Sequence, residues 1–158
     1  MFVIRPRRLL LALLALPLVA AASSEDEVNA VLGLAEAPPG VVFEVVSGSE
    51  TRLVELTPQL KRFAARLRAR FPDLEIALVT HGSEQFSLLS ANAHQYPDLH
   101  REVAALTEQQ AIPVHVCGNH ASWRDNVPDD FPAYVDVAPS AGGQLRHYAE
   151  RGFVLIVL

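Results

Sequence analysis

Short runs of consecutive apolar residues, rich in valine and isoleucine, recur along this chain and constrain its fold more than any other feature. Such runs are typical of strands buried on both faces, whereas half-exposed strands alternate apolar and polar residues. Five runs are predicted as strands: residues 41–46, 74–80, 112–117, 134–138 and 153–158. Helical segments separate them, so the predicted fold is α/β, a three-layer α/β/α sandwich with a mostly parallel five-stranded sheet.

Helix signals lie between these runs. Thr57 followed by Pro58 is typical of a helix start, because proline is tolerated in the first turn. Apolar residues then recur at helical spacing, and the arginines between them are interpreted as a solvated helix face. A further helix is expected to begin at Pro97, and the last one to cover residues 144–150 and end at Gly152.

The first 22 residues have the layout of a secretory signal peptide. Three arginines precede an apolar run from Leu9 to Ala22, and the run ends in small residues. The run has 14 residues, short of the roughly 20 that a membrane-spanning helix needs. We therefore expect cleavage after Ala22 and a periplasmic or secreted protein with no membrane attachment afterwards, the alternative being an uncleaved anchor.

The rest of the chain divides into an acidic segment, residues 23–40, and a domain spanning residues 41–158. The acidic segment is either a flexible spacer or a short helix with Ser24 and Glu27 forming a capping box. Loss of three arginines from a chain with 13 basic and 18 acidic residues changes its formal charge from −5 to −8. An acidic surface without a basic stripe argues against binding to nucleic acid or anionic lipid.

The only cysteine, Cys117, ends the third predicted strand. Reactive groups gather at the carboxyl ends of parallel strands, where His81 and Ser140 are also expected. Gly118 and Asn119 are expected to turn the chain into a short helix. Unpaired backbone N–H groups and the helix dipole at such a helix start stabilise a thiolate, the nucleophilic form of cysteine.

Three histidines lie near Cys117 in this arrangement. His115 shares a strand face with the thiol, and His81 and His120 follow neighbouring segments. Each either assists as a cation or proton carrier or is a hydrogen-bonded structural residue. A second interpretation is a metal or small-ligand module, in which these residues would supply donors for copper or zinc without a recognised metal spacing. Trp123 is expected in the core rather than at an interface.

A single cysteine limits the available thiol chemistry. No disulfide forms within the chain, and no second cysteine resolves one, so self-contained disulfide exchange is excluded. The leading interpretation is carriage, in which the Cys117 thiolate accepts a sulfur atom, becomes a persulfide and hands the sulfur on. It needs no cofactor and no metal. The third interpretation is an assembly subunit whose cysteine is inert.

Four blocks of the sequence resemble successive blocks of the DsrE/DsrF-like proteins, small α/β domains tied to sulfur oxidation and sulfur relay. They read "VVFEVVSG", "LEIALVTHG", "IPVHVCGN" and "VDVAPSAGGQLRHYAERGFVLIVL". The resemblance covers about residues 41–158, and its most specific part is Cys117-Gly118-Asn119 followed by the stretch from Val137 to Ser140. It implies a sulfurtransferase-like carrier with a persulfide on Cys117, a sulfur donor or acceptor protein as partner, and a homo-oligomer, trimeric or hexameric.

Overall fold

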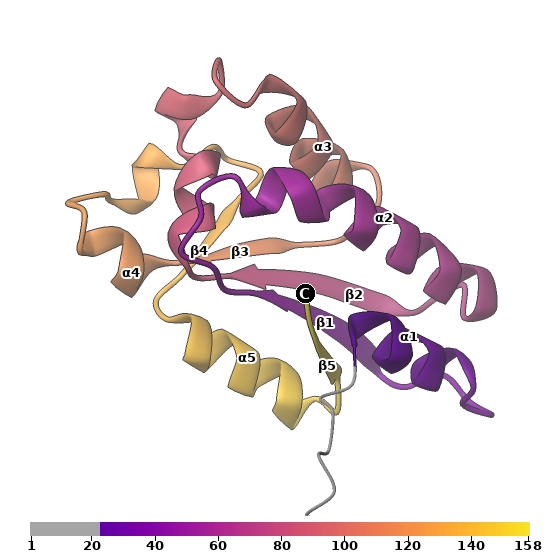
Figure 1. Ribbon diagram of the computed structural model, residues 1–158. Helices are drawn as coiled ribbons and strands as arrows, with labels where there is room; N and C mark the ends of the chain where they lie inside the picture. The colour runs from indigo at the N-terminus through magenta and orange to yellow at the C-terminus, as the bar shows by residue number, and fades with distance from the viewer. Residues whose placement is uncertain (1–22) are drawn as a thin grey trace, which may run out of the picture.

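The computed structural model describes residues 23–158, and the expected signal peptide lies outside this range. The five predicted strands are present: β1 (Gly40–Val45), β2 (Glu75–Thr80), β3 (Val114–Cys117), β4 (Asp136–Ala138) and β5 (Val154–Val157). They form one sheet in the order β4-β3-β2-β1-β5 (Figure 1). Every pairing is parallel. The α/β fold is therefore confirmed, with a sheet that is parallel throughout.

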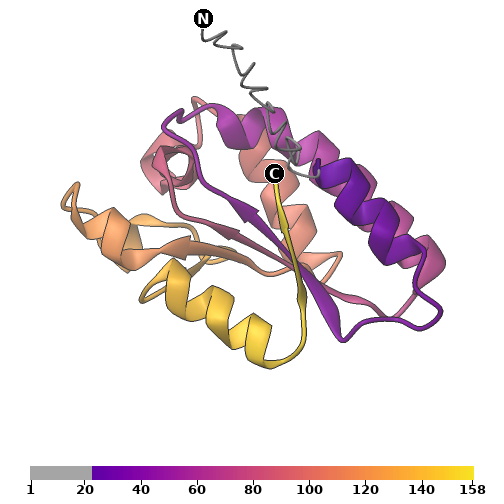
Figure 2. The ribbon, with the colours of Figure 1, turned by 60° about the horizontal axis from the view of Figure 1, so that its bottom comes forward.

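Helices cover the two faces of the sheet unequally, as Figures 1 and 2 show. One face carries α1 (Ser24–Leu32), α2 (Arg52–Arg70) and α3 (Pro97–Glu108), and the other carries α5 (Ala141–Glu150). The short elements η1 (Ser83–Leu88), η2 (Ser90–Asn92), α4 (Gly118–Ser122) and η3 (Pro128–Asp130) lie in the connections. Among residues 23–158, no helix is long and apolar enough to cross a membrane.

Two apolar clusters correspond to the two faces. The larger one packs α1, α2 and α3 on the sheet and includes Phe43 of β1 stacked on Phe63 of α2, with ring centroids 6.2 Å apart. The smaller one packs α5 on the opposite face and includes Val79, Cys117 and Tyr148. The thiol therefore belongs to the thinner of the two layers.

Helix α2 begins at Arg52, five residues before the predicted start at Thr57. Leu53 and Leu56 are buried, so the additional turn stabilises the helix by packing on the sheet. Pro58 consequently lies inside the helix and removes one main-chain hydrogen bond. The prediction was wrong here because a proline-based start signal is local, whereas the packing of the preceding turn is not.

The acidic segment after residue 22 forms helix α1. Its capping box consists of Ser23 and Asp26, one residue earlier than the expected pair Ser24 and Glu27. The hydrogen bond from the Ser23 hydroxyl lowers the pKa of the Asp26 carboxyl, with a smaller contribution from the Ser23 backbone N–H. Val28 and Val31 bury one side of the helix. This segment is therefore packed against the domain rather than being a spacer.

We predict that Phe63→Ala destabilises the fold by about 3–5 kcal/mol, because it leaves a cavity beneath α2 where the ring now packs on Phe43. Urea unfolding followed by circular dichroism measures the change. Val54→Ala on the same helix is the matched control, since the Val54 side chain is 42% exposed. Equal losses of stability in the two variants would contradict this packing of α2.

Candidate functional site

Cys117 lies at the carboxyl end of β3 and occupies the N-cap position of α4. The residue is buried, with 7% exposure. Its Sγ accepts a hydrogen bond from the backbone N–H of Ala141 at 3.4 Å. Ala141 is the first residue of α5, so the sulfur lies at the amino end of a ten-residue helix. The unpaired N–H groups and the dipole at that end stabilise negative charge on sulfur.

The donor to the thiol differs from the expected one. The side chain of Cys117 makes no capping hydrogen bond to α4, and the backbone N–H of Asn119 donates instead to the Pro139 carbonyl at 3.2 Å. The predicted donors at Gly118 and Asn119 are therefore not those that contact sulfur. The reason is that the Cys117 side chain points toward the face covered by α5, whereas α4 continues away from the strand end.

Ser140 and Gly118 shape the walls of the site without touching the sulfur. The Ser140 side chain caps α5 by accepting a hydrogen bond from the Gly143 N–H at 3.1 Å. This cap fixes the helix end that faces the thiol. At Gly118, a Cβ would lie 3.1 Å from the Ala138 carbonyl oxygen. Glycine thus permits the close approach of the end of β4.

Gln85, a residue that the sequence did not single out, fixes the backbone of Cys117. Its Oε1 accepts a hydrogen bond from the Cys117 N–H at 2.9 Å, and its Nε2 donates to the Cys117 carbonyl at 3.3 Å. The β2–β3 ladder ends with Thr80 paired to Val116. The fully buried amide of Gln85 therefore replaces the next strand residue as the partner of Cys117.

Glu84, also missed, is a fully buried carboxylate that joins the ends of β1 and β2. Its four donors are the Thr80 hydroxyl at 2.6 Å, the Gly82 N–H at 2.7 Å, the Ser47 N–H at 2.7 Å and the His81 N–H at 3.2 Å. A Cβ at Gly82 would lie 2.3 Å from the Ser47 backbone, so only glycine fits there. In the sequence, Glu84 and Gln85 are two adjacent polar residues before Phe86. Two adjacent polar residues are usually exposed, so the sequence does not reveal that these two are buried.

His81 pairs with a carboxylate rather than with the thiol. Its Nε2 lies 2.7 Å from Oε1 of Glu44, and both side chains are partly buried. Glu44 is the one charged residue of β1. The backbone N–H of His81 donates to the Val45 carbonyl and so continues the β1–β2 ladder. Because Thr80 pairs with Val116, this register places His81 and Cys117 at the same level of adjacent strands.

His120 and Trp123 form an aromatic surface beyond the end of the sheet. His120 Nδ1 lies 2.7 Å from the His81 carbonyl oxygen, and its ring packs edge-to-face on Phe86 and on Trp123. Trp123 is 78% exposed. The expectation that this tryptophan is a core residue is therefore wrong. Trp123 is the C-cap residue of the short helix α4, which lies beyond the end of β3.

His115 is a hydrogen-bonded structural histidine on the same sheet face as Cys117. Its Nδ1 lies 2.7 Å from Oδ2 of Asp136, and its Nε2 lies 2.8 Å from the Tyr148 hydroxyl. Burial lowers the pKa of His115, and the nearby His147 lowers it further, whereas the Asp136 carboxylate opposes the shift. Burial also raises the pKa of Tyr148. We infer that neutral His115 donates from Nδ1 to Asp136 and accepts from the tyrosine hydroxyl at Nε2.

The residues that the metal interpretation would use as ligands do not come together in the structure. Within the part of the chain that the structure describes, no three histidine, cysteine or acidic side chains lie close enough together to hold a metal ion. His115 is held by Asp136 and Tyr148, and His81 is held by Glu44. The site is thus a single buried thiol with one backbone donor to its sulfur, and the nearby histidines are held by other partners.

We predict that Glu84→Gln destabilises the protein by about 2–3 kcal/mol, because the new amide places an N–H group against backbone N–H donors. Chemical denaturation measures the loss. Glu36→Gln, at an exposed position, is the control and should be neutral. Unchanged stability in Glu84→Gln would show that the carboxylate does not join the strand ends.

We predict that His115 makes the protein less stable in acid. Its folded pKa lies below the ordinary value of 6.5. At a pH between the folded pKa and the ordinary pKa of 6.5, His115 of the unfolded chain binds a proton that His115 of the folded chain does not. The free energy of unfolding therefore falls as the pH drops through 6.5 toward the folded pKa. Unfolding free energies measured from neutral to acidic pH should fall less steeply in His115→Gln, while exposed His94→Gln keeps the wild-type slope. Identical slopes in wild type and His115→Gln would contradict this assignment.

No family model and no curated protein sequence matches this chain. Solved structures share its fold. A protein of unknown function from Methanobacterium thermoautotrophicum, MTH1491, has a TM-score of 0.59 and 21% identity over 75% of this chain and 97% of its own. BT1422 of Bacteroides thetaiotaomicron, also of unknown function, has a TM-score of 0.52 and 13% identity over 74% and 94% of the two chains. The ychN protein of E. coli has a TM-score of 0.48 and 18% identity over 75% and 99%. The first two likenesses show the fold alone, and that fold is consistent with the DsrE/DsrF-like resemblance.

Proposed function

We propose that this protein is a sulfur carrier of sulfurtransferase-like chemistry, which holds a persulfide on Cys117 and passes the sulfur to a partner protein. The observation that carries the proposal is the hydrogen bond from the Ala141 N–H to Sγ at the amino end of α5. That donor and the helix dipole stabilise an anion at this position, and both the thiolate and the persulfide are anions. The layout of residues 1–22 supports a site of action in the periplasm or outside the cell.

The chemistry needs only one cysteine. The Cys117 thiolate attacks the sulfane sulfur of a donor such as thiosulfate or a protein persulfide, and a new S–S bond forms. The S–S bond of the donor breaks, and its electron pair leaves with sulfite or with the donor thiolate. In the return step an acceptor thiolate attacks the outer sulfur, and Cys117 leaves as a thiolate. Sulfur moves at constant oxidation level, so no second cysteine of the chain is oxidised.

The Glu44–His81 pair lies at the same end of the sheet as Cys117 and would take up the proton of the thiol through solvent rather than by direct contact. The two side chains lie 2.7 Å apart, and the strand register supports this role by bringing His81 level with Cys117. A carboxylate that holds one nitrogen of an imidazole orients the ring and stabilises the cation that forms when it accepts a proton. His115 is not assigned this role, because both of its ring nitrogens already have partners.

The burial of Cys117 suits a carrier that must protect its cargo. A persulfide shielded from solvent is kept from small thiols, which would otherwise remove the outer sulfur. The cover over the thiol is nevertheless thin. Gly142, next to the donor residue Ala141, is exposed, and a Cβ at Gly142 would meet no atom within 4 Å. We therefore propose the start of α5 as the side from which a donor would reach the sulfur.

The test is mass spectrometry of the purified protein after incubation with thiosulfate or with a persulfide donor. We predict a mass increase of about 32 Da, one sulfur atom, that reducing thiols remove. Cys117→Ser should gain nothing. If Cys117 of the folded protein stays unmodified, and also resists alkylating agents, the cysteine is inert and the carrier proposal is wrong.

Ala141→Pro is a second variant, which removes the N–H group that donates to sulfur and puts the proline Cδ in the place of that hydrogen. Proline is tolerated at the first position of a helix, and the preceding Ser140 already has the extended conformation that proline requires, with φ −150° and ψ 142°. We predict loading slower by about tenfold or more, because one hydrogen bond to a charged group is lost and the proline ring also crowds the sulfur. Ala141→Ser retains the N–H group and should load at nearly the wild-type rate. Equal rates in all three proteins would show that this hydrogen bond does not support the reaction.

A further inference from the structure

Strand β5 is an edge strand without the usual protection. It ends the sheet order, and among residues 23–158 no strand lies on its outer side. Its sequence, Val-Leu-Ile-Val, has no charged residue and no proline, the residues with which soluble proteins commonly protect free edges. The opposite edge is different, because β4 has only three residues and begins with exposed Asp136. One edge of the sheet is thus protected and the other is open to pairing.

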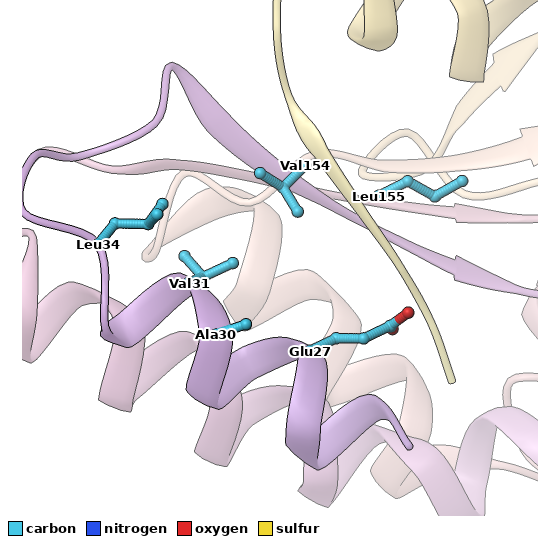
Figure 3. A pocket seen from close by; sticks show the side chains of 6 residues that line it. All are labelled: Glu27, Ala30, Val31, Leu34, Val154 and Leu155. Atoms are coloured by element: carbon cyan, nitrogen blue, oxygen red, sulfur yellow. The ribbon is translucent and has the colours of Figure 1, made fainter. Parts of the chain in front are cut away.

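Apolar surface flanks β5 on both faces. Leu155 and Val157 are 45% and 48% exposed. They share the face of their register partners Val42 and Glu44, whereas α5 packs over β2, β3 and β4 instead. On the other face, a groove of about 290 Å³ separates β5 from α1 (Figure 3). It is lined by Glu27, Ala30, Val31, Leu34, Val154 and Leu155.

The hydrogen-bonding register of β5 is complementary to itself. The Leu158 N–H donates to the Glu44 carbonyl at 2.9 Å, so the main-chain groups of residues 154, 156 and 158 face β1. Those of Leu155 and Val157 therefore face outward. In an antiparallel pair centred on Ile156, Leu155 of one copy and Val157 of the other would exchange both of their main-chain hydrogen bonds. The same pairs would bring these two exposed side chains together on one face.

We propose that two copies of this chain associate through β5, in antiparallel register about a two-fold axis at Ile156. Charge favours a second copy at this edge. The chain carries a formal charge of −5, so two copies repel each other over most of their surface, whereas residues 152–158 have no charged side chain. Glu27 is the one charged residue that lines the adjoining groove.

A stable interface needs more contact area than β5 alone can supply. Specific interfaces bury about 800 Å² on each partner, more than four strand residues supply. We therefore expect the partner to cover the groove beside α1 as well, including the 42% exposed Leu34 that lines it. The dimer is an isologous pair with one continuous sheet across both copies. Because β1 and β2 separate β5 from β3, Cys117 takes no part in the interface.

Analytical ultracentrifugation of the protein purified from expression of the full-length chain tests this association. The wild type should sediment as a dimer at micromolar concentration, or as a hexamer if three such dimers also assemble as the family resemblance implies. Replacing both Leu155 and Val157 by lysine should weaken association by about a hundredfold or more, because it places four charges in the interface. Val54→Lys, at a similarly exposed apolar position on α2, should leave the dimer intact.

A monomeric wild-type protein would overturn the proposal, and so would a lysine variant that assembles like the wild type. Monomer would also be the outcome if residues 1–22 or another protein covered this edge. If the lysine variant does not fold, amide exchange of the wild type gives the answer. The Leu155 and Val157 amides should exchange more slowly as protein concentration rises, and a rate independent of concentration would contradict pairing at β5. Sulfur loading of Cys117 is measured separately, so this proposal and the proposed function fail independently.

Discussion

The buried carboxylate of Glu84 is the interaction on which the site depends. A charged group without solvent is tolerated only when hydrogen-bond donors surround it. Glu84 has four donors, from the last residue of β2 and from the segments that follow β1 and β2. This arrangement holds η1 beneath the strand ends and so delivers Gln85 to the backbone of Cys117. One buried polar pair therefore fixes the ends of three adjacent strands, including the strand that carries the thiol.

The side chain of Cys117 is held by helix α5, which packs on the sheet face opposite to α1, α2 and α3. The start of α5 supplies the hydrogen bond to sulfur through Ala141, and Ser140 holds that helix end in place. His115 joins β3, β4 and α5 through Asp136 and Tyr148. The backbone of Cys117 is thus held from one direction and its sulfur from another, which keeps the sulfur at the helix end without a second cysteine or a metal.

The strands, the α/β fold and the place of Cys117 at a carboxyl edge could be predicted from the sequence, because a run of consecutive apolar residues is a local feature. The start of α2 could not, since burial of Leu53 and Leu56 outweighs the proline signal. The donor to sulfur was assigned to the next residues in the chain, yet it comes from Ala141, 24 positions away. Glu84 could not be identified either, because its burial is a product of the tertiary fold.

The free edge at β5 and the thiol site are separate features of one sheet. The strand register determines which main-chain groups of β5 face outward and at which level Cys117 lies. Reactivity of Cys117 is the central claim, and the rate at which iodoacetamide alkylates the folded protein tests it most directly. We expect Cys117 to react faster than global unfolding allows, as followed by mass spectrometry at neutral pH beside the independently measured unfolding rate. Alkylation no faster than global unfolding would show that Cys117 is an inert core residue and would contradict the account.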